Sequence, residues 1–346
     1  MRVLAIDPGT ISAGIIVVSD DILEDFYEIP SRELSSDPEM IFGIIDRHEP
    51  ELIVAPSGYG LPPVDLRGLD ASQRLLALLT RSDDPGVEEL RYVSHFLRRL
   101  DILRIPVIGI PGVANLASVP ASRKINRIDL GTADKVAIAV LASIIHSGSD
   151  PDDLSRSSFA VIELGAFTAG IAIKDGRIVD GVGGTLFPIG ILSRGGWDGE
   201  EAFLLGRRIY KRDLFKGGLS DICGATDIEI IRSRCPEGYD RYIDDIAKTA
   251  FMLISSIIRG RPQPIDRIKI YISGRGASKK LAYDLSTEYG LDVEILRNYY
   301  REGIKKASEG AALYGLSWAG RKSRRILEIL GILNWVPMRI DQGLLG

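Results

Sequence analysis

The chain has 346 residues, of which 45% are hydrophobic and 26% charged, and its formal net charge is −4. This length allows two domains with cores of their own, and the composition is that of a soluble globular protein. The slightly acidic balance gives no broad basic surface, so no nucleic-acid partner is expected. No apolar stretch is long enough to cross a bilayer and no basic leader begins the chain, so we expect a cytoplasmic protein with no membrane partner.

The first predicted element is a hairpin that recurs in the second half of the chain. Residues 3–24 (VLAIDPGTISAGIIVVSDDILE) align without a gap with residues 159–180 (FAVIELGAFTAGIAIKDGRIVD). In each copy an apolar strand ends in an acid, a turn with glycine and a hydroxyl residue follows, and a second apolar strand returns. Such a turn exposes backbone N–H groups that bind phosphate, and the acid is suited to Mg²⁺. The repeat predicts two domains of similar build that face one polyphosphate.

After the first hairpin, predicted helices and strands alternate. Helices are expected at 38–48, 86–101 and 132–145, and strands at 51–55 and 105–110. The Pro/Gly-rich loop that follows the strand at 51–55 has the composition and the place of loops that line sites in α/β proteins. A stretch rich in Ser and Asp, 147–158, is the predicted linker between the domains.

The second half continues the pattern after its own hairpin. Helices are expected at 200–210, 239–259, 278–289 and 308–318, and strands at 268–273 and 291–296. Because the hairpins are antiparallel and the other strands are joined through helices, the predicted class is α/β with mixed sheets. The predicted domains are residues 1–150, on which the C-terminal helices of 308–346 pack back, and residues 157–307. Cys223 and Cys235 are too few for a disulfide framework and lack the spacing of a zinc site.

Four segments are expected to converge on one nucleotide. Two are the hairpin turns, the third is a glycine turn between a strand and a helix, and the fourth is a helix of small residues that can pack closely across a domain boundary. Each segment alone is a weak signal, because glycine turns are usually structural, but the ordered set with its duplication is specific. The residues are Asp7, Gly9, Thr10 and Ser12; Gly165, Ala166, Phe167 and Thr168; Ser273, Gly274, Arg275 and Gly276; and Glu309, Gly310, Ala311 and Ala312.

These segments resemble motifs of the superfamily of actin, sugar kinases and heat-shock chaperones. That resemblance implies duplicated ribonuclease H-like domains, the actin-like ATPase fold, with a nucleotide cleft between them. The likeness is closest to the acetate/butyrate kinase branch, and particularly to butyrate kinases. The matching segments are Asp7-Pro8-Gly9-Thr10-Ile11-Ser12, Glu163-Leu164-Gly165-Ala166-Phe167-Thr168, Lys216-Gly217-Gly218-Leu219, Ser273-Gly274-Arg275-Gly276 and Glu309-Gly310-Ala311.

The resemblance implies an ATP- and Mg²⁺-dependent kinase that phosphorylates a small acceptor, a short carboxylate, to an acyl phosphate. Arg194 matches an arginine that stabilises the transferring phosphoryl group, a task that suits a planar guanidinium. Asp134 would hold Mg²⁺ or orient the nucleophile, although an acid favoured by the helix dipole is an equal alternative. Asp7 and Glu309 match metal-side positions. The branch also implies self-association, for which the apolar stretch 326–336 is either an interface or a helix packed on the first domain.

Three departures from the butyrate kinase pattern keep a second function open. Glu163 replaces a histidine beside the transferring phosphoryl group, and an anion there is repulsive unless Mg²⁺ intervenes. Ala166 and Phe167 replace turn glycines, so Phe167 is either strained or part of a reshaped loop if a positive φ is required. The arginine expected near 56–60 is absent, with Arg67 the nearest candidate. The alternative is a nucleotide-binding ATPase or switch in which Glu163 orients water; a structural relative without activity is a third reading.

Overall fold

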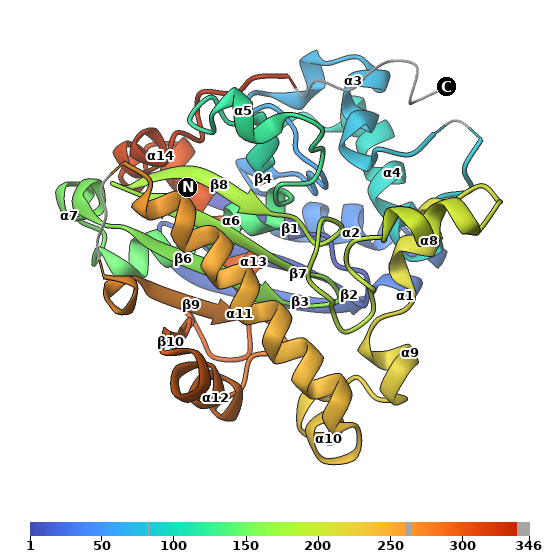
Figure 1. Cartoon of the computed structure of the whole chain (residues 1–346). Coiled ribbons are helices and arrows are strands. Elements are labelled where there is room, and N and C mark those ends of the chain that lie inside the picture. The colour runs from blue at the N-terminus through green and yellow to red at the C-terminus, as the bar shows by residue number, and fades with distance from the viewer. Residues whose placement is uncertain (82, 261–263, 338–346) are drawn as a thin grey trace. The chain divides into compact units, whose positions relative to one another are not determined.

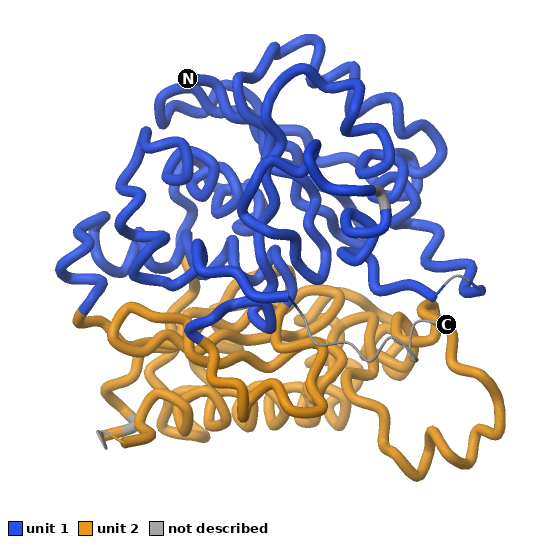
Figure 2. The backbone as a smooth tube through the Cα atoms, turned by 90° about the horizontal axis from the view of Figure 1, so that it is seen from above, with its two compact units in different colours: residues 1–118, 132–155, 297–346 blue, residues 119–131, 156–296 orange. Residues whose placement is uncertain are grey.

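The computed structural model describes residues 1–81, 83–260 and 264–337. The chain divides into two compact units, coloured separately in Figure 2. Unit 1 comprises Met1–Ser118, Thr132–Ser155 and Arg297–Gly346, and unit 2 comprises Val119–Gly131 and Arg156–Leu296. The part of the packing prediction that concerns residues 338–346 lies outside the described residues.

Unit 1 is built on a five-stranded sheet in the order β3-β2-β1-β4-β5 (Figure 1). The first three strands form an antiparallel meander, whereas β4 and β5 run parallel to β1. The strands are β1 Arg2–Asp7, β2 Ser12–Ser19, β3 Ile22–Pro30, β4 Leu52–Val54 and β5 Val107–Ile108. The helices are α1 Ser31–Ser36, α2 Glu39–His48, α3 Ala71–Leu75, α4 Arg91–Arg98, α6 Ala133–His146, α13 Lys306–Trp318 and α14 Arg324–Leu330, with 3₁₀ turns η1 Leu66–Gly68, η2 Leu76–Leu78, η3 Glu88–Leu90, η4 Leu100–Ile102 and η5 Val113–Asn115.

Unit 2 repeats this topology in a sheet with the order β10-β9-β6-β7-β8. Here β6, β7 and β8 form the meander, and β9 and β10 run parallel to β6. The strands are β6 Phe159–Leu164, β7 Thr168–Lys174, β8 Arg177–Val182, β9 Lys269–Ser273 and β10 Asp292–Ile295. The helices are α5 Ala121–Lys124, α8 Gly199–Leu204, α9 Leu219–Cys223, α10 Ile228–Arg234, α11 Pro236–Ile258 and α12 Lys279–Tyr289, with 3₁₀ turns η6 Lys211–Phe215 and η7 Ile265–Arg267; α7 Pro151–Arg156 lies where the chain passes from unit 1 to unit 2.

The predicted fold class is therefore confirmed: two mixed α/β sheets share one strand order, as the sequence repeat requires. In each unit, the hydrophobic core lies between the sheet and the helices that cover it. In unit 1 one face packs with α2 and α4, and α13 lies against β1 and β2. In unit 2 the long helix α11 lies across β6, β7 and β8 (Figure 1). None of the described helices is long and apolar enough to cross a membrane.

The two hairpins differ by one residue in register. Asp7 pairs with Gly14, whereas the corresponding Glu163 pairs with Ala169 and not with Gly170. Because side chains alternate between the faces of a strand, a slip of one residue exchanges the faces of the returning strand. Ser12 therefore shares a face with Asp7, while Thr168 faces away from Glu163. The gapless sequence repeat thus does not produce two identical turns.

Most predicted elements are present, and the differences are local. The helix predicted at 86–101 is broken into η3, α4 and η4, and the helix predicted at 200–210 is only the six-residue α8. The predicted linker contains the short helix α7. The apolar stretch 326–336 begins as α14, whose Ile326, Leu327 and Leu330 are buried and which contacts α6 and α13. This stretch therefore packs against helices of its own unit.

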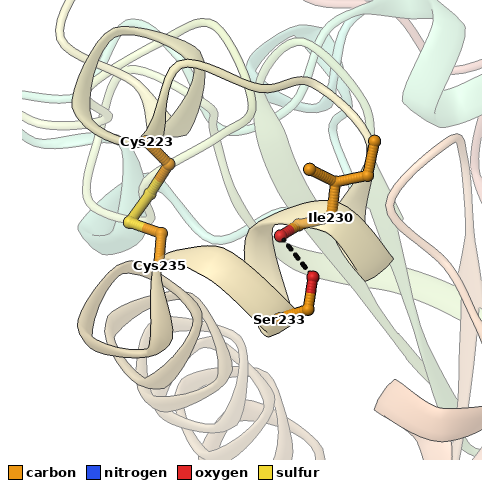
Figure 3. Close-up of a disulfide and its surroundings, with 4 residues drawn as sticks. All are labelled: Cys223, Ile230, Ser233 and Cys235. Carbon is orange, nitrogen blue, oxygen red and sulfur yellow. Dashed lines mark hydrogen bonds between the residues drawn. A yellow bond between two sulfur atoms is a disulfide. The ribbon is translucent and has the colours of Figure 1, made fainter.

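A disulfide joins Cys223 at the end of α9 to Cys235 just before α11 (Figure 3). The two sulfur atoms lie over Gly238, where a Cβ would be 2.4 Å from one and 2.8 Å from the other. The bond closes a short segment that contains α10. Composition excluded a framework of several disulfides, but nothing in the spacing indicated this single one.

Reduction of the disulfide is expected to lower the free energy of unfolding by about 2–3 kcal/mol, since the reduced chain gains loop entropy when it unfolds. Urea denaturation with and without dithiothreitol measures the change. The variant Cys235→Ser should show the lower stability under both conditions. Equal stability of oxidised and reduced wild-type protein would contradict this expectation.

Candidate functional site

The first hairpin turn lies beside a lysine that the sequence analysis did not single out. Lys305, at the N-cap of α13, places Nζ 2.7 Å from Asp7 Oδ2 and donates a hydrogen bond of 2.9 Å to the Ser12 carbonyl. Asp7 is 4% exposed. Across the described residues, the N–H groups of Gly9 and Thr10 donate to no backbone carbonyl, and the Gly9 N–H lies against the buried Tyr92 hydroxyl. The turn therefore offers two backbone donors and an ammonium group beside a buried carboxylate.

Asp134 belongs to the same cluster, because α6 places it in its first helical turn. Its carboxylate accepts hydrogen bonds from Thr132 and Lys135. Burial raises the pKa of Asp134, but the charge of Lys135, these hydrogen bonds and the charge of Lys305 outweigh it, so the pKa lies below its ordinary value. Asp134 is thus an ionised carboxylate within the field of Lys305. We call Asp7, Gly9, Asp134, Lys135 and Lys305 the first cluster.

Glu309 has a different environment from the one predicted. It is fully buried in α13, and its carboxylate accepts hydrogen bonds from the backbone N–H groups of Tyr299, Tyr300 and Arg301. A buried carboxylate is stabilised by such a set of amide donors. These contacts fix the loop that leads into α13, and thereby fix Lys305. The sequence predicted a metal ligand at this position, whereas the observed contacts anchor the loop.

The carboxylates predicted for magnesium are all engaged by other groups. Asp7 faces Lys305, Asp134 accepts from Thr132 and Lys135, and Glu309 accepts from three amides. No group of three or more His, Cys, Asp or Glu side chains suited to a metal occurs in the described ranges. A resident Mg²⁺ would have to displace these partners, so the side chains present do not fit a resident ion.

The second hairpin turn brings Glu163 against two glycines. A Cβ on Gly165 would lie 2.8 and 2.9 Å from the carboxylate oxygens of Glu163, and a Cβ on Gly274 would lie 2.8 Å from Oε1. Gly274 has φ +91°, which glycine adopts readily. The Gly276 N–H donates to the Leu164 carbonyl, so the two turns lie together. Glu163 thus lies between the second hairpin turn and the turn predicted to contact adenosine.

The turn residues Ala166 and Phe167 are not strained. Neither has a positive φ, and the Phe167 ring packs edge-on against Phe215 with centroids 4.8 Å apart. The Gly165 N–H donates to the Phe167 carbonyl, whereas the N–H groups of Ala166 and Phe167 donate no hydrogen bond within the described part of the chain. Of the two alternatives from the sequence, the reshaped loop is therefore correct, and it keeps two backbone donors.

Arg194 is carried by a loop that is bonded to this second turn. The N–H groups of Leu192 and Ser193 both donate to the Ala166 carbonyl, at 2.9 and 3.1 Å. The guanidinium lies 4.1 Å from the centroid of the Trp197 ring and donates a hydrogen bond of 2.7 Å to Glu201. The observed contacts therefore hold Arg194 beside the turn in a defined orientation. Glu163, Gly165, Ala166, Phe167, Arg194 and Gly274 are called the second cluster.

The predicted hydroxyl ligands are less available than the backbone donors. Ser12 Oγ donates to Glu28. Thr168 and Ser273 are buried, with 0% and 1% exposure. Arg275 is exposed at the tip of its turn. Of the polar groups in these turns, the backbone N–H groups are therefore more available to a ligand than the hydroxyls.

The loop predicted to line an acceptor pocket is held by internal hydrogen bonds. Ser57 Oγ donates to the Ala55 carbonyl and accepts from the Ile110 N–H. Arg67, the nearest substitute for the missing arginine, forms a bidentate pair with Asp65 and also reaches the Leu103 carbonyl. Arg67 is therefore occupied by an acid of its own segment.

Both units have the same strand order, and in both an acid lies near the end of the first hairpin strand. This arrangement is that of the two-unit actin-like ATPase fold. Solved structures share this fold. An acetate kinase from Porphyromonas gingivalis has a TM-score of 0.60 and 11% sequence identity, and the match covers 92% of this chain and 99% of that one. A propionate kinase from Francisella tularensis subsp. tularensis SCHU S4 has a TM-score of 0.59 and 12% identity, with 90% of this chain and 98% of that one covered. An acetate kinase from Entamoeba histolytica is also similar, with a TM-score of 0.58 and 13% identity over 84% of this chain and 86% of that one. At these identities the likeness shows a common fold.

The chain belongs to the family described as "Protein of unknown function (DUF1464)", whose model matches residues 5–341. No match was found among curated protein sequences.

Sequence reasoning did not find Lys305, Trp197 or Glu201. Lys305 lies in a stretch without a motif and reaches the first turn only because the chain's end returns to the first sheet. Trp197 and Glu201 follow Arg194 closely, so their proximity was available as a signal. Their contacts with Arg194 could not be predicted, because cation–π stacking and ion pairing depend on the conformation of the loop.

Proposed function

We propose that this protein is an ATP-dependent phosphotransferase that passes the γ-phosphoryl group to a small acceptor, by resemblance a short carboxylate as in butyrate kinases. Mg²⁺ would arrive with ATP as part of the substrate. The observation that carries the proposal is the pair of hairpin turns, each with two backbone N–H groups that donate to no backbone carbonyl in the described residues. Clustered N–H donors of this kind bind phosphate oxygens.

Each residue's role follows from its chemistry. Gly9 and Thr10 in one turn, and Ala166 and Phe167 in the other, would bind phosphates through the backbone. Arg194 would neutralise charge on the transferring group, since its guanidinium donates to two oxygens at once. Asp134, which stays ionised because of its lysine neighbours, would orient the nucleophile. The turn at Ser273–Gly276 would contact the adenosine.

The carboxylate acceptor rests on the resemblance alone. A small carboxylate needs a cationic partner, and the loop that would supply one has its Arg67 paired with Asp65. Acceptors without a charge, such as alcohols, therefore belong in the same test. The observed contacts support phosphoryl transfer from ATP more strongly than they support a carboxylate as the acceptor.

The test is incubation with ATP, Mg²⁺ and a panel of short carboxylates and small alcohols, with products identified by phosphorus NMR. A new acyl-phosphate signal that requires a carboxylate is the expected result. A phosphate-ester signal would keep the kinase and replace the acceptor class. ATP that persists unchanged with every acceptor and in the acceptor-free control would count against phosphotransfer.

The second candidate is an ATPase or nucleotide switch in which water is the nucleophile. The observation in its favour is Glu163, whose carboxylate lies against the turns at Gly165 and Gly274. An ionised carboxylate in that place can orient water. Free phosphate formed at one rate with and without acceptors would favour this reading.

A further inference from the structure

The side chain of Lys305 reaches the first hairpin through a passage that two glycines keep open. A Cβ on Gly9 would lie 2.8 Å from Lys305 Nζ, and a Cβ on Gly14 would lie 3.2 Å from Lys305 Cδ. Gly9 has no positive φ, so its need for glycine at this point is steric. The same Cβ atoms would lie even closer to the Ser12 carbonyl oxygen, at 2.3 Å, and to Ser308 Oγ, at 2.2 Å, so the lysine is one of several groups packed on these glycines. Its side chain is 26% exposed.

The ammonium group has donor capacity left for a ligand. Its contacts among the described residues are Asp7 at 2.7 Å and the Ser12 carbonyl at 2.9 Å, and an ammonium has three N–H donors. A lysine that only locked α13 to β1 would need no exposed surface. Here the partly exposed lysine adjoins Gly9 and Thr10, whose N–H groups donate to no backbone carbonyl within the described part of the chain.

The charges of the first cluster explain why a cation is needed at this turn. Asp7 and Asp134 are both carboxylates, and without compensation they would repel a polyphosphate. Lys305 faces Asp7 and also lowers the pKa of Asp134, while Lys135 pairs with Asp134 directly. The two ammonium groups balance the two carboxylates.

We propose that Lys305 is a phosphate-binding residue: its ammonium donates to a phosphate oxygen of the nucleotide held at Gly9 and Thr10, and it compensates the buried Asp7 carboxylate that would otherwise repel that oxygen. This inference rests on the proposed function, because it needs a nucleotide at the first turn. The ammonium of Lys305 would then supply positive charge beside Asp7, which the sequence predicted to be a metal ligand.

The test is ATP binding measured by calorimetry in EDTA and again with Mg²⁺. Lys305→Met, which keeps most of the side chain's length, should bind ATP in EDTA at least tenfold more weakly than the wild type. Asp7→Asn, which releases the ammonium from its carboxylate, should bind Mg²⁺-free ATP as tightly as the wild type or more tightly. Lys306→Met is the matched control, since Lys306 begins the same helix but donates to Asn298, and its affinity should stay at the wild-type value.

A purely structural ion pair predicts another pattern, because losing either partner would weaken binding alike. Equal weakening in Asp7→Asn and Lys305→Met, or wild-type affinity in Lys305→Met, would overturn the inference and leave the proposed function standing. Absence of ATP binding by the wild type would overturn both. If Lys305→Met does not fold because Asp7 is left buried and unpaired, the double variant Asp7→Asn/Lys305→Met replaces it, and it should bind ATP at least tenfold more weakly than Asp7→Asn alone.

Discussion

Replacing Gly310 by alanine is expected to destabilise unit 1 by about 3 kcal/mol or more, beyond the usual cost of overpacking. Gly310 lies where α13 crosses α6, and a Cβ there would be 2.0 Å from the Ala137 carbonyl oxygen and 2.4 Å from its carbon. Both atoms are backbone, so the helices themselves must separate. Alanine's better helix propensity offsets only about 1 kcal/mol of this cost.

The measurement is thermal unfolding, and the expected fall in melting temperature is roughly 6–12 °C for a unit of this size. Gly43→Ala is the matched control, because Gly43 is also inside a helix of unit 1 but has nothing within 4 Å of its added Cβ. That variant should be slightly stabilised. A Gly310→Ala protein as stable as the wild type would mean that the two helices do not pack this closely.

Separation of these helices should also affect the first cluster. Asp134 lies in the first turn of α6, and Lys305 lies at the N-cap of α13, so the crossing at Gly310 holds both near the first hairpin. The sequence predicted from Gly310, Ala311 and Ala312 a helix that packs closely across a domain boundary. The helix is buried as expected, but the partner α6 that it packs against belongs to the same unit. What the sequence could not give was the partner, because α6 lies far away along the chain.

The hairpins show where sequence reasoning succeeds and where it ends. Apolar runs, an acid and a glycine turn predicted both hairpins and the duplicated class, since these patterns depend on local geometry. The slip in register between Asp7–Gly14 and Glu163–Ala169 could not be predicted, because it depends on how each turn closes. For the same reason Ser12 and Thr168, which align in sequence, face differently.

Side-chain contacts were the least predictable part of the site. Glu309 and Asp7 were chosen as metal ligands because of their chemistry and their match to a motif. Their actual partners, the amides of 299–301 and the ammonium of Lys305, come from a loop without a recognisable pattern. A carboxylate's role depends on which donors the tertiary structure brings to it, and that information is not local.

Arg194→Ala is expected to lower kcat by about 10³-fold, since a transition-state arginine contributes 10³–10⁵ in phosphoryl transfer. That factor corresponds to about 4 kcal/mol of barrier. The arginine is held on the second turn through Leu192 and Ser193 and is oriented by Trp197 and Glu201. Arg194→Lys should also be impaired, by about 10²-fold, because an ammonium keeps the charge but loses the planar fork that matches phosphoryl oxygens. Nucleotide affinity should change much less than kcat in both variants.

The control is Arg212→Ala, which removes another arginine of unit 2 that lies over an aromatic ring, here Tyr210 at 5.5 Å. Its kcat should equal that of the wild type, so a general effect of losing a stacked arginine is separated from catalysis. Steady-state rates with the acceptor found by NMR, and ATP affinity by calorimetry, give the comparison. If Arg194→Ala turned over at the wild-type rate, the pairing with Glu201 would be the arginine's main task, and its proposed part in phosphoryl transfer would be wrong.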